Sequence, residues 1–253
     1  MSELIAVTFA SLAAAFVNSI AGGGGLVSLP ILFGLFPNAP PATLFGTNKS
    51  AMVWGTAWAA GSYAKHVRLP WRMLVPAIVA ALVGGVIGAW LVTLVSGEWL
   101  RRLLPVMLAL VLAFTLAQKD LGHTHAPKFT GTQQAFIATL ISLALGLYDG
   151  FFGPGTGSFF IFLFVKVLGF DFLHAVGSAK VLNTATNLAS LALFAWSGNV
   201  WWKFMIPMAV ANVVGSALGT KLALKHGAPF IRIVFALVVG VLILKTGWDA
   251  YFR

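Results

Sequence analysis

The chain has 253 residues, of which 59% are hydrophobic and only 9% are charged, and its mean hydropathy is +0.94. A soluble domain keeps about a quarter of its residues charged, so this composition excludes a soluble globular protein. The absence of cysteine excludes disulfides and iron–sulfur clusters, and the net charge of +10 comes mostly from basic residues beside apolar segments, which indicates membrane topology rather than nucleic-acid binding.

Five apolar segments are expected in the first half, over residues 4–20, 26–36, 43–63, 73–95 and 101–117. Several approach the ~20 residues that a transmembrane helix needs. The second segment spans only ~16 Å as a helix, about half a bilayer. We therefore expect an all-α, multi-pass integral membrane protein in contact with lipid, located in the inner (cell) membrane of a bacterium or an archaeon. An oligomer is possible.

A run of four glycines, residues 22–25, separates the first two segments. Unwound backbone at membrane depth is tolerated only where protein buries it or where it lines a watery cavity. The helix that resumes after the break offers free N–H groups and the positive end of its dipole, which favours an anion. Close packing of helices through small residues is the alternative interpretation. The run does not continue into the Gly-Lys-Ser/Thr of a nucleotide-binding loop.

Lys49 lies in "LFGTNKSAMVWG", some five residues into the third segment. A charged lysine inside a bilayer is costly and by default marks a substrate or ion pathway. Snorkelling of the side chain to the interface is the alternative.

A polar linker, residues 118–133, joins the two halves. It contains His123 and His125, but two histidines without further ligands make a weak metal site, so we expect no metal and no cofactor. His174, near the end of a later segment, is interpreted as a histidine at the level of the lipid headgroups.

The second half of the chain repeats the first with a shift of 131 positions and no gap. Matched pairs include Gly22 and Gly153, Lys49 and Lys180, Trp71 and Trp202, Pro76 and Pro207, and Gly88 and Gly219. Residues 1–117 and 134–253 are therefore predicted to be two homologous repeats within one membrane domain. Duplication with matched interruptions is typical of secondary transporters, whose binding sites lie at the breaks. The repeats are inverted if each short segment turns back, which we favour, and parallel if it continues.

The second break, residues 153–157, reads Gly-Pro-Gly-Thr-Gly, and Asp149 precedes it. Asp149 is matched by Asn18 and is the one acid inside an apolar segment. With a nearby cation such as Lys180, it could carry a proton for coupling; a structural hydrogen bond that holds the break open is the other interpretation. Lys180, Asn183 and Asn187 share one helical face. Two lysines facing two helix N-termini would make an anion receptor.

The segments "IAGGGGLVSLPIL", "FFGPGTGSFF", "GTNKSA" and "GSAKVLNTATN" together resemble the sulfite exporter TauE/SafE family of membrane permeases, over essentially the whole chain. The Gly-Pro-Gly-Thr-Gly sequence departs from a plain glycine run, which argues against equal roles for the two halves. By motif match the resemblance implies these site residues: Asn18, Gly22, Gly23, Gly24, Gly25, Thr47, Asn48, Lys49, Asp149, Gly153, Gly155, Thr156, Gly157, Ser178, Lys180 and Asn183. Asn187 is added from the polar face.

The resemblance implies a secondary transporter of a small organosulfur anion, such as sulfite, sulfoacetate or another sulfonate, in either direction. We expect alternating access, with the anion near the midplane and with possible proton coupling through Asp149. An enzyme is not expected, because no Ser/His or paired-carboxylate arrangement occurs at helical spacing. An anion channel and a membrane-embedded scaffold are the alternatives.

Overall fold

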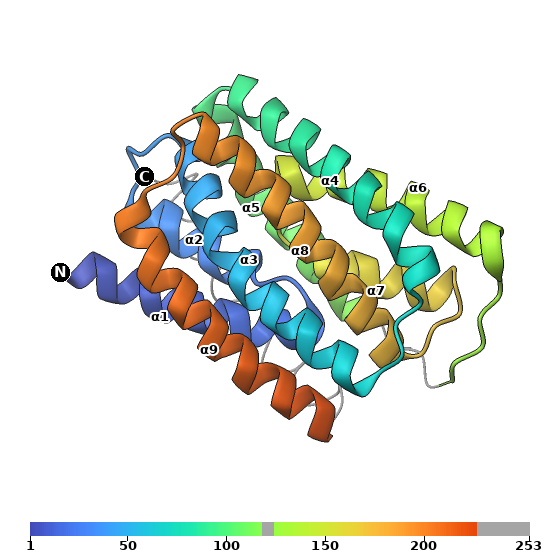
Figure 1. Ribbon diagram of the computed structural model, residues 1–253. Helices are drawn as coiled ribbons and strands as arrows, with labels where there is room; N and C mark the ends of the chain where they lie inside the picture. Colours follow the sequence, from blue (N-terminus) through green and yellow to red (C-terminus); the bar gives the residue numbers. More distant parts are fainter. Residues whose placement is uncertain (118–123, 227–253) are drawn as a thin grey trace.

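The computed structural model describes residues 1–117 and 124–226, and these residues form nine helices and no strand (Figure 1). The helices are α1 (Ser2–Ala21), α2 (Gly25–Leu35), α3 (Pro41–His66), α4 (Trp71–Leu94), α5 (Gly97–Ala117), α6 (Gly131–Phe151), α7 (Thr156–Lys166), α8 (Phe172–Trp196) and α9 (Trp202–His226). The expected all-α architecture is confirmed. The last part of the proposed second repeat, residues 227–253, and the first part of the linker, with His123, lie outside the described residues.

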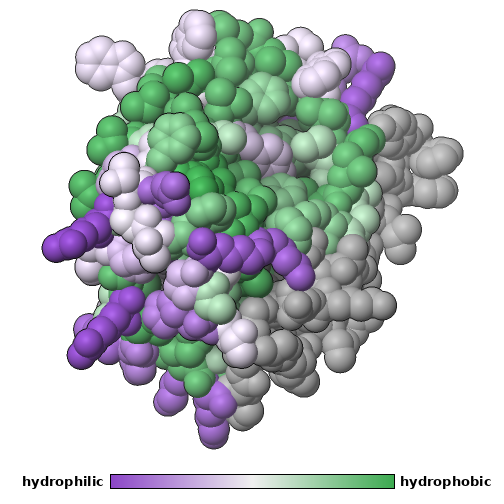
Figure 2. Space-filling model, turned by 90° about the vertical axis from the view of Figure 1, so that its right-hand side faces the viewer, coloured by the Kyte–Doolittle hydropathy of each residue, from purple (hydrophilic) through white to green (hydrophobic). Residues whose placement is uncertain are grey.

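Four helices, α1, α4, α6 and α9, are long and apolar enough to cross a membrane. Their outward faces expose large apolar side chains, among them Phe9, Val79, Leu140 and Val210. Such faces are stable in lipid, where a soluble protein would have to bury them. Figure 2 shows a broad hydrophobic surface with hydrophilic side chains gathered below it. The chain is a multi-pass integral membrane protein.

The helices pack in the order α1, α9, α3, α8, α4 and α6, so that α3 and α8 lie side by side in the middle (Figure 1). Small residues permit the close approach of the outer helices. A Cβ added at Gly88 of α4 would overlap the backbone of α6, and one added at the matched Gly219 of α9 would overlap the backbone of α1. The central pair is thus covered by helices on two sides, and its polar residues are buried, although Trp54, Trp58 and Leu188 remain exposed.

The contacts between helices fix their directions. The Ser11 hydroxyl of α1 donates to the Met208 carbonyl of α9 at 2.8 Å, and Gly219, farther along α9, packs against Phe16, farther along α1. These two helices are therefore parallel. The helix α3 is also parallel to α9, because its start receives the Trp201 N–H at Thr47 and its middle packs on Asn212. Since α1 and α3 start on the same side, the short helix α2 between them turns back.

The central pair is antiparallel. Gly46, near the start of α3, packs against Phe194, near the end of α8, and Gly177, near the start of α8, packs against Tyr63, near the end of α3. With a shift of 131 positions, α1 to α4 map onto α6 to α9, and all four pairs of helices agree in length within one residue. Corresponding helices run in opposite directions, as the inverted arrangement predicts.

One end of the helix bundle is strongly basic. The ends of α3, α7 and α9 meet the starts of α4, α6 and α8 there, and the basic residues at this end are Lys65, Arg68, Arg72, Lys128, Lys166 and Lys225. The opposite end carries Arg101, Arg102 and Lys203 together with Glu3 and Glu98. The two ends therefore differ in charge, with the excess of positive charge at the first.

Candidate functional site

A small cavity of about 20 Å³ lies where the two helix breaks meet. This space holds about one water molecule, so a larger ligand would need the walls to move apart. Its lining residues are Asn18, Gly23, Gly24, Gly25, Leu29, Asn48, Lys49, Met52, Asp149, Phe152, Gly153, Gly157, Asn183 and Asn187. Side chains and backbone from both halves thus converge on one space near the middle of the bundle.

The two breaks need glycine at their matched first positions. Gly22 and Gly153 have φ angles of +79° and +94°, which L side chains rarely adopt. Gly22 also touches the other break, because a Cβ there would overlap the backbone of Gly157 and Ser158. Both helices are therefore interrupted at the place where the two breaks are in contact.

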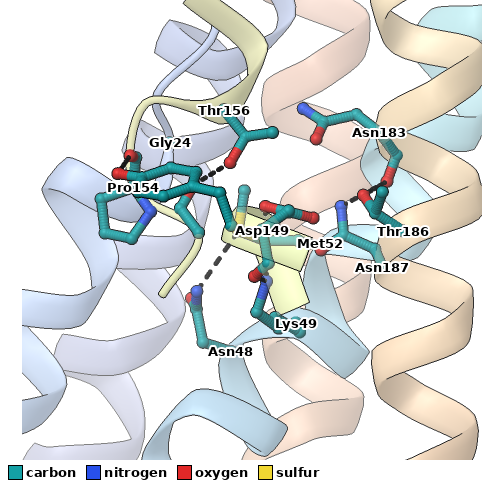
Figure 3. A network of polar contacts seen from close by, with 12 residues as sticks. Gly24, Asn48, Lys49, Met52, Asp149, Pro154, Thr156, Asn183, Thr186 and Asn187 are labelled. Carbon is teal, nitrogen blue, oxygen red and sulfur yellow. Dashed lines mark hydrogen bonds and ion pairs between the residues drawn. The ribbon is translucent and has the colours of Figure 1, made fainter. Parts of the chain in front are cut away.

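Asp149 and Lys49 form a buried ion pair in the wall of the cavity (Figure 3). The Lys49 Nζ lies 3.4 Å from Asp149 Oδ1, and the two side chains are 4% and 5% exposed. The same ammonium donates to the backbone carbonyl of Asp149. Asp149 Oδ2 is buried and has no hydrogen-bond partner among the described residues. The carboxylate thus offers the cavity an unused acceptor.

Lys180 occupies the matched position in the other half and makes the matched contact. Its ammonium donates to the backbone carbonyl of Asn18, the residue matched to Asp149. Lys180 is fully buried, does not line the cavity, and has no ion-pair partner in the part of the chain that the structure describes. Each lysine therefore binds the opposite half of the chain, at the carbonyl that precedes the break of that opposite half.

The lysines were expected to face helix N-termini; both ammoniums instead bind carbonyls at helix C-termini, although Lys49 also lines the cavity together with the start of α2. Asn18 and Asp149 lie in the last turns of α1 and α6, so both ammoniums bind the negative ends of helix dipoles. The cation beside Asp149 is Lys49 and not Lys180. The antiparallel packing of α3 and α8 explains both differences, because it carries each lysine across to the opposite half.

Amide side chains complete the lining. Asn187 Nδ2 donates to the Asn183 carbonyl at 2.8 Å on α8, and Asn48 Nδ2 lies 3.3 Å from the Met52 sulfur on α3 (Figure 3). Asn18 Nδ2 and Asn48 Oδ1 have no hydrogen-bond partner among the described residues. Buried polar atoms without partners are costly, so a polar ligand or water in the cavity would stabilise them.

Six predicted site residues lie outside the lining: Gly22, Thr47, Gly155, Thr156, Ser178 and Lys180. The hydroxyls of the two threonines make structural hydrogen bonds. The Thr47 hydroxyl accepts the Trp201 N–H at 3.0 Å before α9, and the Thr156 hydroxyl donates to the Gly153 carbonyl at 2.8 Å within the break.

Three lining residues, Leu29, Met52 and Phe152, were not predicted from the sequence. Met52 carried a usable signal, because it lies three residues after Lys49 and hence on the same helical face. Leu29 and Phe152 carried none, since apolar residues are abundant throughout the chain.

Comparisons with known proteins agree over almost the entire chain. The family model described as "Sulfite exporter TauE/SafE" matches residues 7–246. A probable membrane transporter protein of Sinorhizobium, ORF9, is 34% identical over 93% of this chain and 89% of its own length. A probable membrane transporter protein of Haemophilus influenzae is 31% identical over 98% and 96%. The probable membrane transporter protein YfcA of Escherichia coli K12 is 32% identical over 96% and 89%. No solved structure matches significantly.

Proposed function

This chain belongs to the sulfite exporter TauE/SafE family, and from that premise we propose that it is a secondary transporter of a small organosulfur anion such as sulfite or a sulfonate. The relatives are named as membrane transporters, which supports the general class. The proposal that the substrate is an anion rests on the excess of buried positive charge at the breaks.

Three charged side chains are buried in the described part of the bundle: Lys49, Lys180 and Asp149. Two lysines and one aspartate leave one positive charge without a counter-ion. An uncompensated charge in a low-dielectric interior is very unfavourable, and a bound anion in the adjoining cavity would offset it. A cation would meet repulsion from the two ammoniums, of which only Lys49 is paired with a carboxylate among the described residues.

The helix dipoles also favour an anion in the cavity. The lysines offset the negative ends of α1 and α6. The start of α2, through Gly23, Gly24 and Gly25, remains at the cavity and presents a positive dipole end. In our proposal the anion accepts hydrogen bonds from this backbone and from the Lys49 ammonium, and the Asn48, Asn183 and Asn187 amides orient its oxygens.

The inverted halves supply a route for alternating access. The cavity lies between two antiparallel units that share the same helix plan, and inverted units can exchange their conformations about a central site. Movement of one set of helices against the other would open the cavity to the two sides in turn. An anion channel would need no such exchange.

Asp149 is our candidate for proton coupling. Its carboxylate shares Lys49 with the proposed anion, it lines the cavity, and its buried Oδ2 has no hydrogen-bond partner among the described residues. A proton on Asp149 would free the Lys49 charge for the anion. Protonation and anion binding would then favour each other.

We assign the basic end of the bundle to the cytoplasm by the positive-inside rule. Because the chain has no cysteine, single cysteines at the exposed Arg68 and Lys203 can be labelled without background. An impermeant thiol reagent applied to intact cells should label Lys203→Cys and spare Arg68→Cys. Labelling of Arg68→Cys alone would reverse the orientation.

The transport proposal is tested by uptake into proteoliposomes. Sulfite, sulfoacetate and other sulfonates are the test anions, with choline as a cationic control. We expect saturable uptake of at least one organosulfur anion, and acceleration by the same anion on the far side (counterflow). Uptake without counterflow would indicate a channel. Absence of flux and of any anion-induced thermal stabilisation would favour a scaffold.

A further inference from the structure

We propose that His125, Asp171 and His174 form a binding site for a divalent transition metal of the zinc type, outside the transport cavity. His125 belongs to the linker between the halves, Asp171 precedes α8, and His174 lies in the first turn of α8. One donor atom from each residue lies within 4.8 Å of the other two. The structure thus adds two ligands to a linker histidine that looked isolated in the sequence.

The distances are close to those of a metal site. Asp171 Oδ2 lies 3.1 Å from His125 Nδ1 and 2.6 Å from His174 Nδ1. Tetrahedral zinc holds nitrogen and oxygen donors at ~2.0–2.2 Å, which places neighbouring donors roughly 3.3 Å apart. A small rotation of His174 away from Asp171 would therefore admit the ion. The imidazole rings lie side by side, with centroids 4.0 Å apart.

The Asp171 carboxylate is already oriented to bind a metal ion together with the two histidines. Its Oδ1 accepts the His174 backbone N–H at 3.0 Å and caps α8, which leaves Oδ2 facing both imidazoles. The Oδ2 atom thus lies within reach of both Nδ1 atoms, where an ion could bridge the three residues.

The backbone around the cluster holds the linker in place. The Ala126 N–H donates to the Gly169 carbonyl at 2.9 Å, and the Lys128 N–H donates to the Leu168 carbonyl at 3.0 Å. Phe170 packs against the His125 ring on one side. The three ligands remain 21–36% exposed, so an ion can reach them from water. Two imidazoles and one carboxylate suit zinc, with water in the remaining position.

A bound metal would tie the linker between the two halves to the start of α8, the helix that carries Lys180. We therefore expect metal binding to stabilise the packing of the linker, α8 and α6. This effect does not depend on transport and can be measured with the purified protein alone.

The test is calorimetric titration of the full-length, detergent-purified protein with Zn²⁺, after removal of any polyhistidine tag. We expect one ion per chain and a rise in the thermal unfolding midpoint that a chelator reverses. His125→Ala and His174→Ala should each weaken binding by about tenfold or more, since even the loss of a group beside a ligand costs that much. Asp171→Asn should weaken it while keeping the helix cap, because asparagine is also a good N-cap residue.

His66→Ala is the matched control. His66 is exposed at the same end of the bundle, at the end of α3, and lies outside the cluster. Its removal should leave binding unchanged. Equal Zn²⁺ affinity in the wild type and in the folded His125→Ala/His174→Ala double variant would overturn the proposal, as would the absence of binding to the wild type.

Discussion

The two helix breaks share one plan but differ in charge. At the first break, Asn18 precedes the glycines and its carbonyl receives Lys180; at the second, Asp149 precedes them and its carbonyl receives Lys49. Lys49 and Asp149 both line the cavity, whereas Lys180 is buried behind it. The reciprocal lysine contacts are thus common to both breaks, and the ion pair is found only at the second break among the described residues.

This difference suggests a division of roles. The first break supplies the uncharged backbone of α2 and a lysine contact that stabilises the end of α1. The second break supplies the charges that a substrate and a proton can compete for. A substitution at one break should therefore differ in effect from the matched substitution at the other.

The largest effect is expected from Lys49→Ala. It leaves the buried Asp149 carboxylate without its cation, which costs about 3–5 kcal/mol of the free energy of unfolding, and it removes the ammonium from the cavity. Uptake should be lost, and the thermal unfolding midpoint in detergent should fall sharply.

The double variant Lys49→Ala/Asp149→Asn separates these two effects. It removes the unpaired carboxylate and should recover most of the stability. Uptake should remain lost, because the remaining positive charge belongs to Lys180, which lies outside the cavity. Restored uptake would show that the net charge matters and that the position of Lys49 does not.

Alanine substitutions at the matched glycines should have different effects on folding and on uptake. Gly22→Ala forces a backbone conformation that costs about 1–3 kcal/mol and also overlaps the backbone of the other break, so little folded protein is expected. Gly153→Ala has similar backbone strain, but its Cβ would lie 2.8 Å from the flexible end of Lys49. That variant should fold and lose uptake. Size-exclusion chromatography and uptake assays distinguish the outcomes, and equal expression of both variants would contradict the account.

The smallest effect is expected from Asp149→Asn, which makes the second break resemble the first. Removal of the competing carboxylate should strengthen equilibrium anion binding by about tenfold and abolish the stimulation of uptake by a proton gradient. The reverse change at the matched position, Asn18→Asp, should weaken anion binding. Unaltered proton dependence in Asp149→Asn would remove Asp149 from the coupling proposal.

The sequence predicted the fold well for identifiable reasons. Apolar length located the helices, and the interrupted runs marked the places where α1 and α6 end. The gapless match of the two halves also gave the correspondence of α1 to α4 with α6 to α9. The direction of the halves was harder, because it depends on the return of α2, and no local residue pattern encodes that return.

The partners of the site residues were not predictable from the sequence. Lys49 and Asp149 are 100 positions apart, and only the antiparallel packing of α3 and α8 brings Lys49 to α6. Motif matching likewise could not separate Lys49, which lines the cavity, from Lys180, which does not. The matched positions are equivalent in the sequence, and the two lysines differ only in their three-dimensional surroundings.

The most direct test of the central claim is a crystal structure with bound selenite, the heavier analogue of sulfite, which anomalous scattering locates without ambiguity. We predict one selenium peak within the cavity, within hydrogen-bonding reach of the Lys49 ammonium and of the backbone at the start of α2. A peak beside Lys180, or at the surface with the cavity empty, would contradict the assignment of the anion site to the cavity between the two breaks.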